Sequence, residues 1–442
     1  MRKIHFITFG CQMNKLDSDL AAESLADAGH AIVDDEYAAD TVIFNTCAVR
    51  DHAEQRVVSR LAQLIPRRAA NPDFRVGIMG CFAEREGETL LRQLPHLDFA
   101  VGTRQFPNLP RAIEEMDEKP GLFGPDEKDN PGIHQAHARR RHRGMHGFVS
   151  VMRGCDNRCS YCIVPDVRGG EISRPAQEIA LEVKSLAAAG AKEVTLLGQN
   201  IDAYGKRSGG SLANLLRLID LETKDTGLLR LRFVTSHPRD ITRDLVETVA
   251  EVERVCAHFH MPAQSGSDKI LAAMRRGYSR GGYDEKIALI REIIPSAGIA
   301  SDFIVGFPGE TEADYLATRE LVEKARFQNS YIFKYSPRPG TPSAEEMADD
   351  VPQDEKKRRN NDLLAVQNAV NDSRGAEMIG RRLTVLAEGV SSRDERRWVG
   401  RSVENYICVF AAPPEGEDWR GRLVELEVES ATPLTLYCRV VR

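Results

Sequence analysis

Three cysteines lie close together near the middle of the chain, in a glycine-rich loop after a short apolar run. Cys155, Cys159 and Cys162 have the spacing C-x-x-x-C-x-x-C, with Tyr161 before the third. Three thiolates on one short loop can bind a cubane iron–sulfur cluster and leave its fourth iron without a protein ligand. Such an open iron suits the amino and carboxylate groups of S-adenosylmethionine. A zinc knuckle or buried cysteines are the alternatives, but zinc usually takes a fourth Cys or His nearby, and no second C-x-x-C pair follows.

Three further cysteines, Cys11, Cys47 and Cys81, each come directly after a predicted strand. The strands are expected at residues 4–9, 41–45 and 75–79, with amphipathic helices at 16–28, 53–65 and 84–93. This alternation predicts a doubly wound parallel sheet over residues 1–116. The carboxyl ends of its strands share one edge, where ligands gather. The cysteines are therefore candidates for a second metal site, although a free cysteine is also a common buried hydrophobe.

From residue 148 to 372 the strand–helix alternation resumes on a larger scale. Strands expected at 148–152, 193–197, 231–235, 258–261, 300–307 and 331–335 suit a partial (β/α)6 barrel, in which chemistry lies at the carboxyl ends of the strands. Polar or glycine residues follow four of these strands and are candidates for binding S-adenosylmethionine or a substrate: Gln199, Asn200, Ser236, Gln264 and Gly306. Taken singly, most of them are better explained as turn, helix-cap or loop residues, and what favours function is that all of them lie on the rim that carries the cysteine loop.

The segment 375–442 changes character, with short β-rich runs between turns. We expect a small antiparallel β-barrel or sandwich. Trp398 lies among several arginines, a pattern that suits phosphate contact and base stacking but also a solvated loop over a core tryptophan. The arginines are Arg393, Arg396, Arg397 and Arg401.

A polar linker is expected at 117–147, and its arginines, Arg139, Arg140, Arg141 and Arg143, either contact RNA or form a solvated charge run. Cys256, Cys408 and Cys438 are expected to be buried. The chain has 442 residues, 42% hydrophobic and 29% charged, with a net charge of −6. These values are typical of a soluble globular protein. The negative net charge excludes an overall positive field that would attract nucleic acid.

The apolar run at the N-terminus is too short for a signal peptide or a membrane span, which predicts a cytoplasmic protein without membrane contact. In a reducing compartment, the cysteines are expected to bind metal or to be buried rather than to form disulfides.

With these residues described, the chain resembles the methylthiotransferase branch of the radical S-adenosylmethionine enzymes over essentially its whole length. The segment VLAEGVSSRDERRWVGR resembles the small RNA-binding barrel, called TRAM, that ends these proteins. The stretches TSHPRD and HMPAQSGSDKIL are most similar to those of the members that modify a prenylated adenosine in tRNA. The second of these continues as HMPAQSGSDKILAAMRRGY in the match. The other matching stretches are TFGCQMN, NTCAVR, GIMGCFAE, GCDNRCSYCIVPDVRGGEISRP, LLGQNIDAYG, DFIVGFPGET and YSPRPGTP.

The resemblance implies two 4Fe-4S clusters, one on Cys11, Cys47 and Cys81 and one on Cys155, Cys159 and Cys162. It also implies radical cleavage of S-adenosylmethionine and methylthiolation of C2 of an isopentenylated adenosine in the tRNA anticodon stem-loop. A monomer served by an electron donor such as flavodoxin or ferredoxin is expected. The alternatives are a methylthiotransferase acting on a ribosomal protein or on threonylcarbamoyl-adenosine in tRNA, and a non-enzymatic zinc or RNA-binding protein.

Overall fold

The computed structural model describes residues 1–48, 51–116, 121–123, 137 and 144–441. It divides into two compact units, which are described separately below. The first comprises Met1–His142, Phe148–Asp156 and Cys162–Ile172, and the second comprises Arg143–Gly147, Asn157–Tyr161 and Ser173–Arg442. The arginines of the predicted linker, Arg139 to Arg141 and Arg143, lie outside the described residues.

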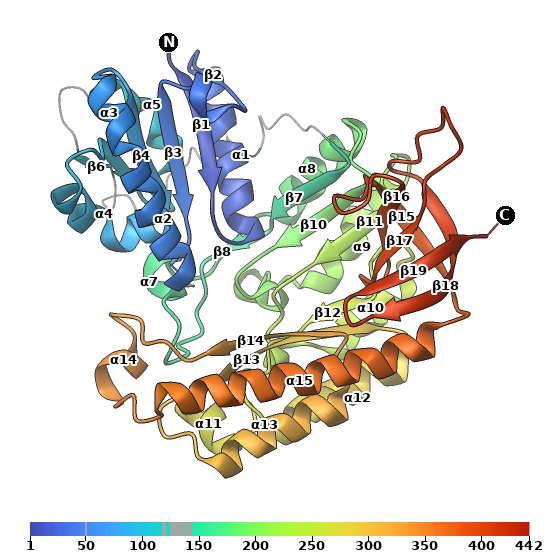
Figure 1. Ribbon diagram of the computed structural model, residues 1–442. Coiled ribbons are helices and arrows are strands. Elements are labelled where there is room, and N and C mark those ends of the chain that lie inside the picture. Colours follow the sequence, from blue (N-terminus) through green and yellow to red (C-terminus); the bar gives the residue numbers. More distant parts are fainter. Residues whose placement is uncertain (49–50, 117–120, 124–136, 138–143, 442) are drawn as a thin grey trace. The chain divides into compact units, whose positions relative to one another are not determined.

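A six-stranded parallel sheet forms the first unit, in the order β2-β1-β3-β4-β5-β6 (Figure 1). The predicted strands are confirmed as β1 (Lys3–Thr8), β3 (Thr41–Thr46) and β4 (Arg75–Gly80). Three short strands were not predicted, because two or three residues show no periodicity: β2 (Ala31–Ile32), β5 (Phe99–Val101) and β6 (Gly121–Phe123).

Both faces of this sheet are covered, since every residue of β3 is buried. Val42, Phe44, Val76 and Ile78 lie in one core cluster beneath α2 and α4. The chain turns back between β2 and β3, so that β1 and β3 flank the topological switch point, where such sheets bind ligands. The helices are α1 (Gln12–Asp27), α2 (Asp51–Gln63), α3 (Ile65–Ala70), α4 (Cys81–Gln93), α5 (Leu109–Glu115) and α7 (Val164–Arg168).

Six strands of the central segment confirm the predicted open α/β barrel. They form two three-stranded sheets, in the orders β11-β10-β7 and β12-β13-β14, and a parallel bridge from Leu231 to Val255 continues from β11 toward β12. The strands are β7 (His146–Ser150), β10 (Glu193–Leu197), β11 (Arg230–Phe233), β12 (His258–His260), β13 (Gly298–Val305) and β14 (Asn329–Lys334). The first residues of β7 belong to the second unit and the rest to the first.

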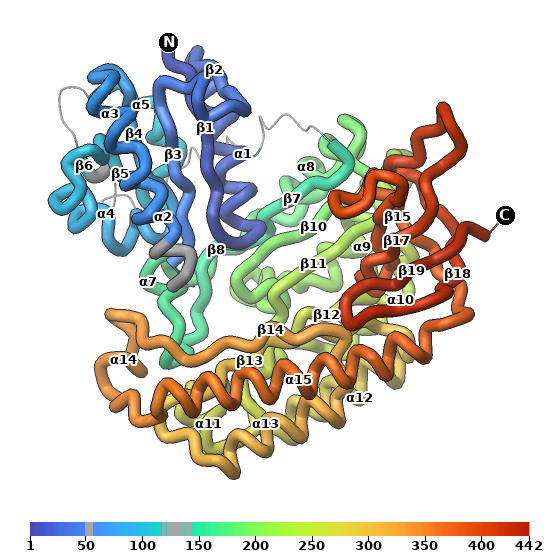
Figure 2. The backbone as a smooth tube through the Cα atoms, in the orientation of Figure 1, coloured from blue at the N-terminus to red at the C-terminus, as the bar shows by residue number. Residues whose placement is uncertain are grey.

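Helices alternate with these strands. The last of them, α15, packs along α13 and β14 and leads into the terminal barrel (Figure 2). The helices are α8 (Ala176–Ala188), α9 (Leu212–Thr223), α10 (Arg243–Glu251), α11 (Asp268–Ala273), α12 (Arg280–Ile293), α13 (Glu312–Ala325), α14 (Pro342–Glu346) and α15 (Gln353–Met378). Two short strands, β8 (Met152–Arg153) and β9 (Ile172–Ser173), flank the cysteine loop.

The C-terminal segment is a closed five-stranded barrel, as predicted, in the order β15-β16-β17-β19-β18. Four pairings are antiparallel, but β17 and β19 pair in parallel, because a single reversing strand, β18, separates them in the chain. The strands are β15 (Arg382–Val390), β16 (Arg397–Ser402), β17 (Ile407–Ala411), β18 (Leu423–Thr432) and β19 (Thr435–Val440).

Buried arginines of β11 attach this barrel to the amino ends of the central strands. Arg230 donates to the backbone oxygens of Arg401 and, at 2.8 Å, of Thr384. Arg232 donates to the backbone oxygen of Ser402 at 2.8 Å and forms an ion pair with Glu193 of β10 at 2.8 Å. Backbone oxygens of the barrel thus accept hydrogen bonds from two buried, positively charged side chains.

The turn between β16 and β17 also reaches the first residue of β13. A Cβ atom on Gly298 would lie only 2.4 Å from the backbone oxygen of Glu404, so the two backbones are in close contact. Within the described residues, no helix has the length and apolarity needed to cross a membrane.

Candidate metal centres and the strand-end rim

The structure brings the three N-terminal cysteines to the carboxyl ends of three neighbouring strands. Cys11 is the N-cap of α1 after β1, Cys47 directly follows β3, and Cys81 is the first residue of α4 after β4. Cys11 and Cys81 therefore lie at the N-termini of α1 and α4, and Cys47 lies in the loop between them in the sheet order. A Cβ atom on Gly10, which has a φ of +127°, would lie 2.7 Å from Cys47 Cβ, so only glycine fits there.

A buried asparagine ties these strand ends together. The Asn14 amide nitrogen donates to Asn45 Oδ1 at 3.1 Å and to the Thr46 backbone oxygen at 3.0 Å. Its oxygen accepts from Cys11 Sγ at 3.3 Å. The first turn of α1 is thereby fixed to the end of β3.

Arg168, on α7, contributes a cation to the same group of side chains. Its guanidinium is buried, with Nε 3.3 Å from Cys81 Sγ and Nη2 2.9 Å from Asp17 Oδ2. Burial raises the pKa of the Cys81 thiol, the positive charge of Arg168 opposes that rise, and nearby Cys11 adds to it. Cys81 packs with Ala48, Ile163 and Val167 in a small apolar cluster.

The second cysteine group lies on a loop that the two units share. Gly154 has a φ of +75°, and a Cβ there would lie 2.0 Å from the backbone oxygen of Gly170, so the turn into the loop requires glycine. Cys155 then donates its backbone N–H to the Gly169 oxygen at 3.1 Å. Cys155 and Cys162 belong to the first unit and Cys159 to the second.

In the second unit, the loop residues next to Cys159 are held by the end of α11. The Ser160 hydroxyl donates to the Ala273 oxygen at 2.8 Å. The Tyr161 ring packs edge-on against Phe307, with ring centroids 6.5 Å apart. Arg276 then reaches the loop, its Nη1 lying 3.4 Å from Cys159 Sγ and 3.3 Å from the Tyr161 hydroxyl. Tyr161, the aromatic residue of the cysteine motif, is thus held in position by its packing against Phe307.

The described residues contain no group of three His, Cys, Asp or Glu side chains close enough to hold a single metal ion. A cubane differs from a single ion, because each cysteine binds a different iron. The donor set fits such a cluster by type, since each triad offers thiols with a buried guanidinium beside one sulfur.

The predicted rim residues lie at the carboxyl ends of consecutive central strands. Asn200 and half-buried Gln199 follow β10, Ser236 follows β11, Gln264 follows β12 and Gly306 follows β13. Gln264 and its neighbour in the rim, Thr235, have positive φ values of 68° and 73°. Left-handed backbone at a non-glycine residue costs about 1–3 kcal/mol and is concentrated at functional sites.

A carboxylate pair lies behind this rim. Asp240 accepts from the Asn200 amide at 2.7 Å and from Lys206 at 2.6 Å. Burial would raise the Asp240 pKa, but these two donors lower it. Asp202 is also buried, and burial raises its pKa to about 7, with a further contribution from Asp240.

Two polar atoms in this region have no hydrogen-bond partner among the described residues. Asn200 uses its nitrogen for Asp240, and its Oδ1 is buried without a donor. Burial lowers the His237 pKa to about 3, and Nδ1 accepts from the Arg239 backbone, so the proton of the neutral ring is on Nε2. That Nε2 is also buried and unpartnered. Buried atoms of this kind normally have partners, so an acceptor and a donor are available for a ligand.

The Gly306 loop is supported from below by buried ions. Gly306 donates its backbone N–H to Glu310 Oε2 at 2.6 Å, and Glu310 pairs with Arg359 at 2.8 Å. A Cβ on Gly306, which has a φ of +71°, would lie 2.3 Å from Cγ of Lys356. The backbone at this strand end is therefore closely fixed.

In the terminal barrel, the structure separates the tryptophan from the arginines. Trp398 points inward from β16 into the barrel core and is only 6% exposed, so its ring is not on the surface for base stacking. Arg397 and Arg401 point outward from the same strand, and each is within 4 Å of an acidic partner. Arg396 and Arg393 precede the strand and are exposed.

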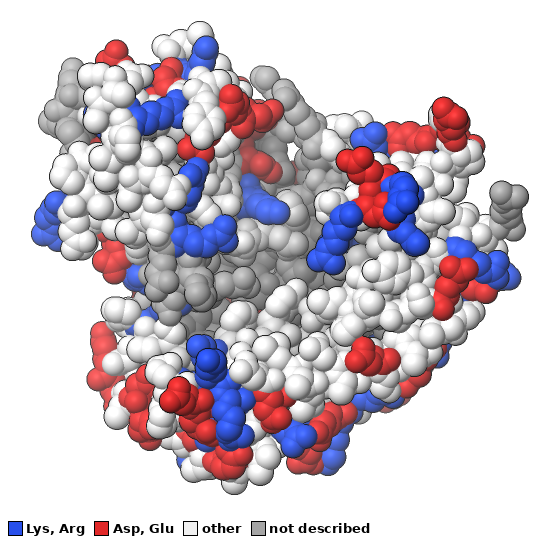
Figure 3. Space-filling view, viewed as in Figure 1, with Lys and Arg blue, Asp and Glu red and all other residues white. Residues whose placement is uncertain are grey.

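Charges of both signs are mixed on the surface. On the face drawn in Figure 3, Lys and Arg are interspersed with Asp and Glu over the terminal barrel and over α13 and α15. From Arg374 to the end, 11 arginines balance 11 acidic residues. RNA contact by this face would therefore depend on local arginines.

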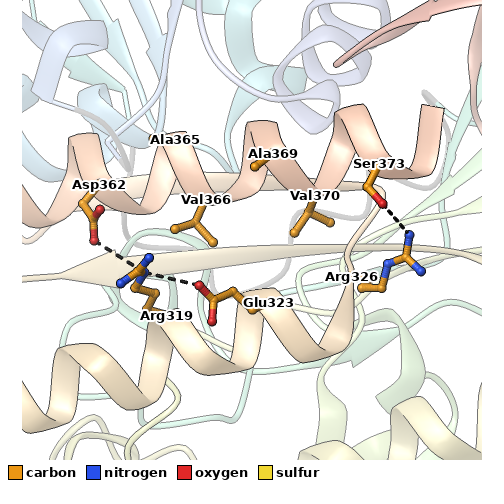
Figure 4. A pocket seen from close by; sticks show the side chains of 9 residues that line it. All are labelled: Arg319, Glu323, Arg326, Asp362, Ala365, Val366, Ala369, Val370 and Ser373. Atoms are coloured by element: carbon orange, nitrogen blue, oxygen red, sulfur yellow. Dashed lines mark hydrogen bonds and ion pairs between the residues drawn. The ribbon is translucent and has the colours of Figure 1, made fainter. Parts of the chain in front are cut away.

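A groove of about 500 Å³ lies between α13 and α15 (Figure 4). Arg319 lies in it between Glu323 at 3.4 Å and Asp362 at 3.8 Å, and Val366 lines its floor. None of the residues predicted from the sequence lines this groove.

Several residues of these sites were not predicted, namely Asn14, Asp17, Arg168, Lys206, Asp240 and Arg276. Four of them stand in stretches that carry the family resemblance: TFGCQMN, DVRGGEISRP, TSHPRD and AAMRRGY. The signal was therefore in the motifs, but the partners of these side chains are distant in sequence.

Two family models match this chain. Residues 3–102 match the uncharacterized protein family UPF0004, and residues 149–322 match the radical SAM superfamily. A tRNA-2-methylthio-N(6)-dimethylallyladenosine synthase from Carboxydothermus hydrogenoformans is 41% identical, over 97% of this chain and 96% of its own length. One from Geobacter sulfurreducens is 44% identical, over 92% and 90%. The chain belongs to this synthase family. The members are radical SAM methylthiotransferases, and the predicted enzyme class is thus confirmed.

Solved structures support the fold at low sequence identity. The radical S-adenosylmethionine methyltransferase TsrM from Kitasatospora setae has a TM-score of 0.59 at 16% identity, over 78% of this chain and 74% of that one. The cobalamin-dependent radical enzyme OxsB has a TM-score of 0.53 at 11% identity, over 83% and 56%. These likenesses support the predicted architecture alone.

Proposed function

We propose that this synthase-family chain replaces the C2 hydrogen of N6-isopentenyladenosine, next to the anticodon of tRNA, with a methylthio group. The observation that carries this proposal is full-length identity of about 40% to synthases named for this reaction. The position of the N-terminal cysteines, at three neighbouring strand ends, supports it.

Two 4Fe-4S clusters are part of the proposal. Cys155, Cys159 and Cys162 would hold one, and Cys11, Cys47 and Cys81 the other. Bound with S-adenosylmethionine, such a cluster supplies a 5′-deoxyadenosyl radical, which can act on an aromatic C–H that acid or base chemistry leaves untouched. The chain itself contributes binding, orientation and the exclusion of water.

The rim residues would hold S-adenosylmethionine and the target base. Asn200 Oδ1 offers an acceptor and His237 Nε2 a donor, and Ser236, Gln264, Gln199 and the Gly306 backbone border them. The adenine must leave its stack to reach such a site, because its C2 is enclosed in the stacked anticodon loop.

Contact with the tRNA backbone is assigned to the terminal barrel. Arg393, Arg396, Arg397 and Arg401 are its candidate phosphate contacts, and buried Trp398 supports them from the core. An external one-electron donor such as flavodoxin or ferredoxin, a monomeric chain and a cytoplasmic location complete the proposal.

A ribosomal protein substrate is the second candidate, because the terminal barrel carries no net positive charge. Mass spectrometry of tRNA nucleosides separates the two. Cells that lack the gene are expected to lose 2-methylthio-N6-isopentenyladenosine and to accumulate the unthiolated nucleoside. Unchanged tRNA, together with a lost modification on a ribosomal protein, would favour the second candidate.

The roles of the two triads are tested by single substitutions in purified protein. Cys159→Ala is expected to abolish both 5′-deoxyadenosine formation and product. Cys47→Ala should still form 5′-deoxyadenosine but yield no methylthio product. Cys256→Ala, at a buried cysteine outside both triads, is the matched control and should retain both. Normal thiomethylation by Cys47→Ala would make the N-terminal triad structural.

A further inference from the structure

Each cysteine triad has one buried arginine whose guanidinium contacts one sulfur. Arg168 Nε lies 3.3 Å from Cys81 Sγ, and Arg276 Nη1 lies 3.4 Å from Cys159 Sγ. The two arginines are only 4% and 6% exposed. A guanidinium is always protonated, so each contact places a fixed positive charge beside a sulfur.

The remaining partners of Arg276 are neutral. Its Nε donates to the Tyr278 hydroxyl at 3.1 Å, Nη2 to the Pro262 oxygen at 3.0 Å, and Nη1 to the Tyr161 hydroxyl at 3.3 Å. Tyr278 is itself fixed, because its hydroxyl donates to the Ala263 oxygen at 2.8 Å. Among the residues that the structure describes, no carboxylate lies within 4.0 Å of this guanidinium.

Burying a cation without a counter-charge is unfavourable, so such cations normally have an anion beside them. Cysteine binds iron as a thiolate, so with the cluster bound the Cys159 sulfur, 3.4 Å from Arg276 Nη1, would supply the negative charge that this guanidinium lacks.

Arg168 differs in one respect. Its Nη2 forms an ion pair with Asp17 at 2.9 Å, and Asp17 is also desolvated. The carboxylate balances the guanidinium, so the field at Cys81 is the small remainder of two opposite charges. The field at Cys159 is that of an unbalanced cation.

We propose that Arg276 is a positioning residue that fixes the Cys159 sulfur and raises the reduction potential of the cluster bound there, whereas Arg168, balanced by Asp17, mainly fixes Cys81. Reduction adds one electron from an external donor to a cluster that three thiolates already make negative. A nearby fixed cation stabilises the reduced form more than the oxidised form, and hydrogen bonds to the sulfurs act in the same direction. This inference rests on the proposed function, because it requires both clusters.

The test is a redox titration of the full-length, anaerobically reconstituted protein with dithionite, followed by electron paramagnetic resonance. The loop cluster is recognised as the signal that S-adenosylmethionine changes. Arg276→Gln is expected to lower the reduced-to-oxidised ratio of this cluster at least tenfold at the wild-type midpoint, which is about 59 mV for one electron. Arg276→Lys keeps the charge and should shift the ratio less.

The neighbouring Arg275→Gln is the matched control. Arg275 is about half exposed and pairs with Glu346 at 3.0 Å, so its removal should leave the potential unchanged. Asp17→Asn is an independent test in which the reduction potential is expected to shift in the opposite direction. It unmasks the Arg168 charge and should raise the potential of the N-terminal cluster, with the loop cluster unchanged.

An unshifted potential in either Arg276→Gln or Asp17→Asn, at full iron content, would overturn the inference. If one variant does not fold, the other decides. A wild-type protein that binds no clusters would defeat the proposed function instead. A wild type that binds both clusters and thiomethylates tRNA, with unshifted variants, would defeat this inference alone.

Discussion

Asp202 is a buried carboxylic acid whose charge changes within the working pH range. It accepts from the Ser236 hydroxyl and from the His237 backbone, both at 3.2 Å. Its pKa of about 7, raised mainly by burial, compares with an ordinary value of 3.8. Between these values the folded chain keeps a proton that the unfolded chain has lost. This contribution to stability is therefore complete below about pH 4 and is lost as the pH rises through 7.

We expect Asp202→Asn to remove this pH dependence, because an amide stays neutral. The melting temperature of the variant, relative to wild type, should rise from pH 5 to about pH 7 in thermal unfolding and level off above that pH. The exposed Asp244, replaced by Asn, is the control and should give a pH-independent difference. A constant difference for Asp202→Asn would mean that the buried group titrates normally.

At this scale, the sequence predicts six cysteines as candidate ligands but not the residues around them. Cysteines after strands and in a close spacing have a recognisable chemistry. Arg168 and Arg276 lie 87 and 117 residues from the sulfurs they contact, and they look like ordinary surface arginines until the fold brings them there. Trp398 is the reverse case, since neighbouring arginines suggested a surface role for a side chain that the strand alternation turns inward.

Among the elements, the turn between β1 and α1 leaves little space beside the N-terminal cysteines. Its Gly10 leaves no room for a side chain next to Cys47. Gly29, after α1, also has a positive φ, of +87°, but nothing lies within 4 Å of its missing Cβ. A side chain at either position would be strained by the positive φ, but only at Gly10 would it also collide with a neighbouring residue.

Gly10→Ala is accordingly expected to displace Cys47 and to remove about half of the iron, which is one of two four-iron clusters. Gly29→Ala should carry the same backbone strain with full iron. Iron and acid-labile sulfide analysis of reconstituted protein measures both. Equal iron in the two variants would show that the close contact is not needed for the N-terminal cluster.

The strands and helices that were predicted are those with clear periodicity. β1, β3, β4 and β10 begin and end close to the expected residues, because each contains a short apolar run, and nearly every residue of β3, β4 and β10 is buried. The unpredicted β16 contains two arginines and a glycine, and its strand character comes from its pairing with β15 and β17. Pairing between distant segments leaves no local signal in a sequence.

The whole molecule is acidic, with a net charge of −6, although tRNA is its proposed substrate. Phosphate attraction must then come from a few arginines whose acidic partners compete for them. Arg397 is 3.8 Å from Asp394 and Arg401 is 3.2 Å from Glu388, and both arginines are nearly half exposed. Surface ion pairs are weak enough to be exchanged for phosphate contacts.

Replacing both Arg397 and Arg401 by Gln is therefore expected to weaken tRNA binding. The slope of log affinity against log salt should fall by roughly one to two, which is about one for each lost phosphate contact. Filter binding over a range of salt concentrations measures this slope. Arg420→Gln, at an exposed arginine paired with Asp418 in another loop of the barrel, should leave it unchanged. An unchanged slope in the double variant would place the RNA elsewhere.

The attachment of the terminal barrel through main-chain oxygens has a consequence for how this protein can diversify. Every amino acid carries a carbonyl, so the joint made by Arg230 and Arg232 survives almost any exchange of the outward side chains on β16. The outward side chains of β16 can thus change while the hydrogen bonds that hold the barrel to β11 stay the same. Removing the barrel, by contrast, would take away the backbone oxygens that accept from Arg230 and Arg232 and would leave Arg232 only its ion pair with Glu193.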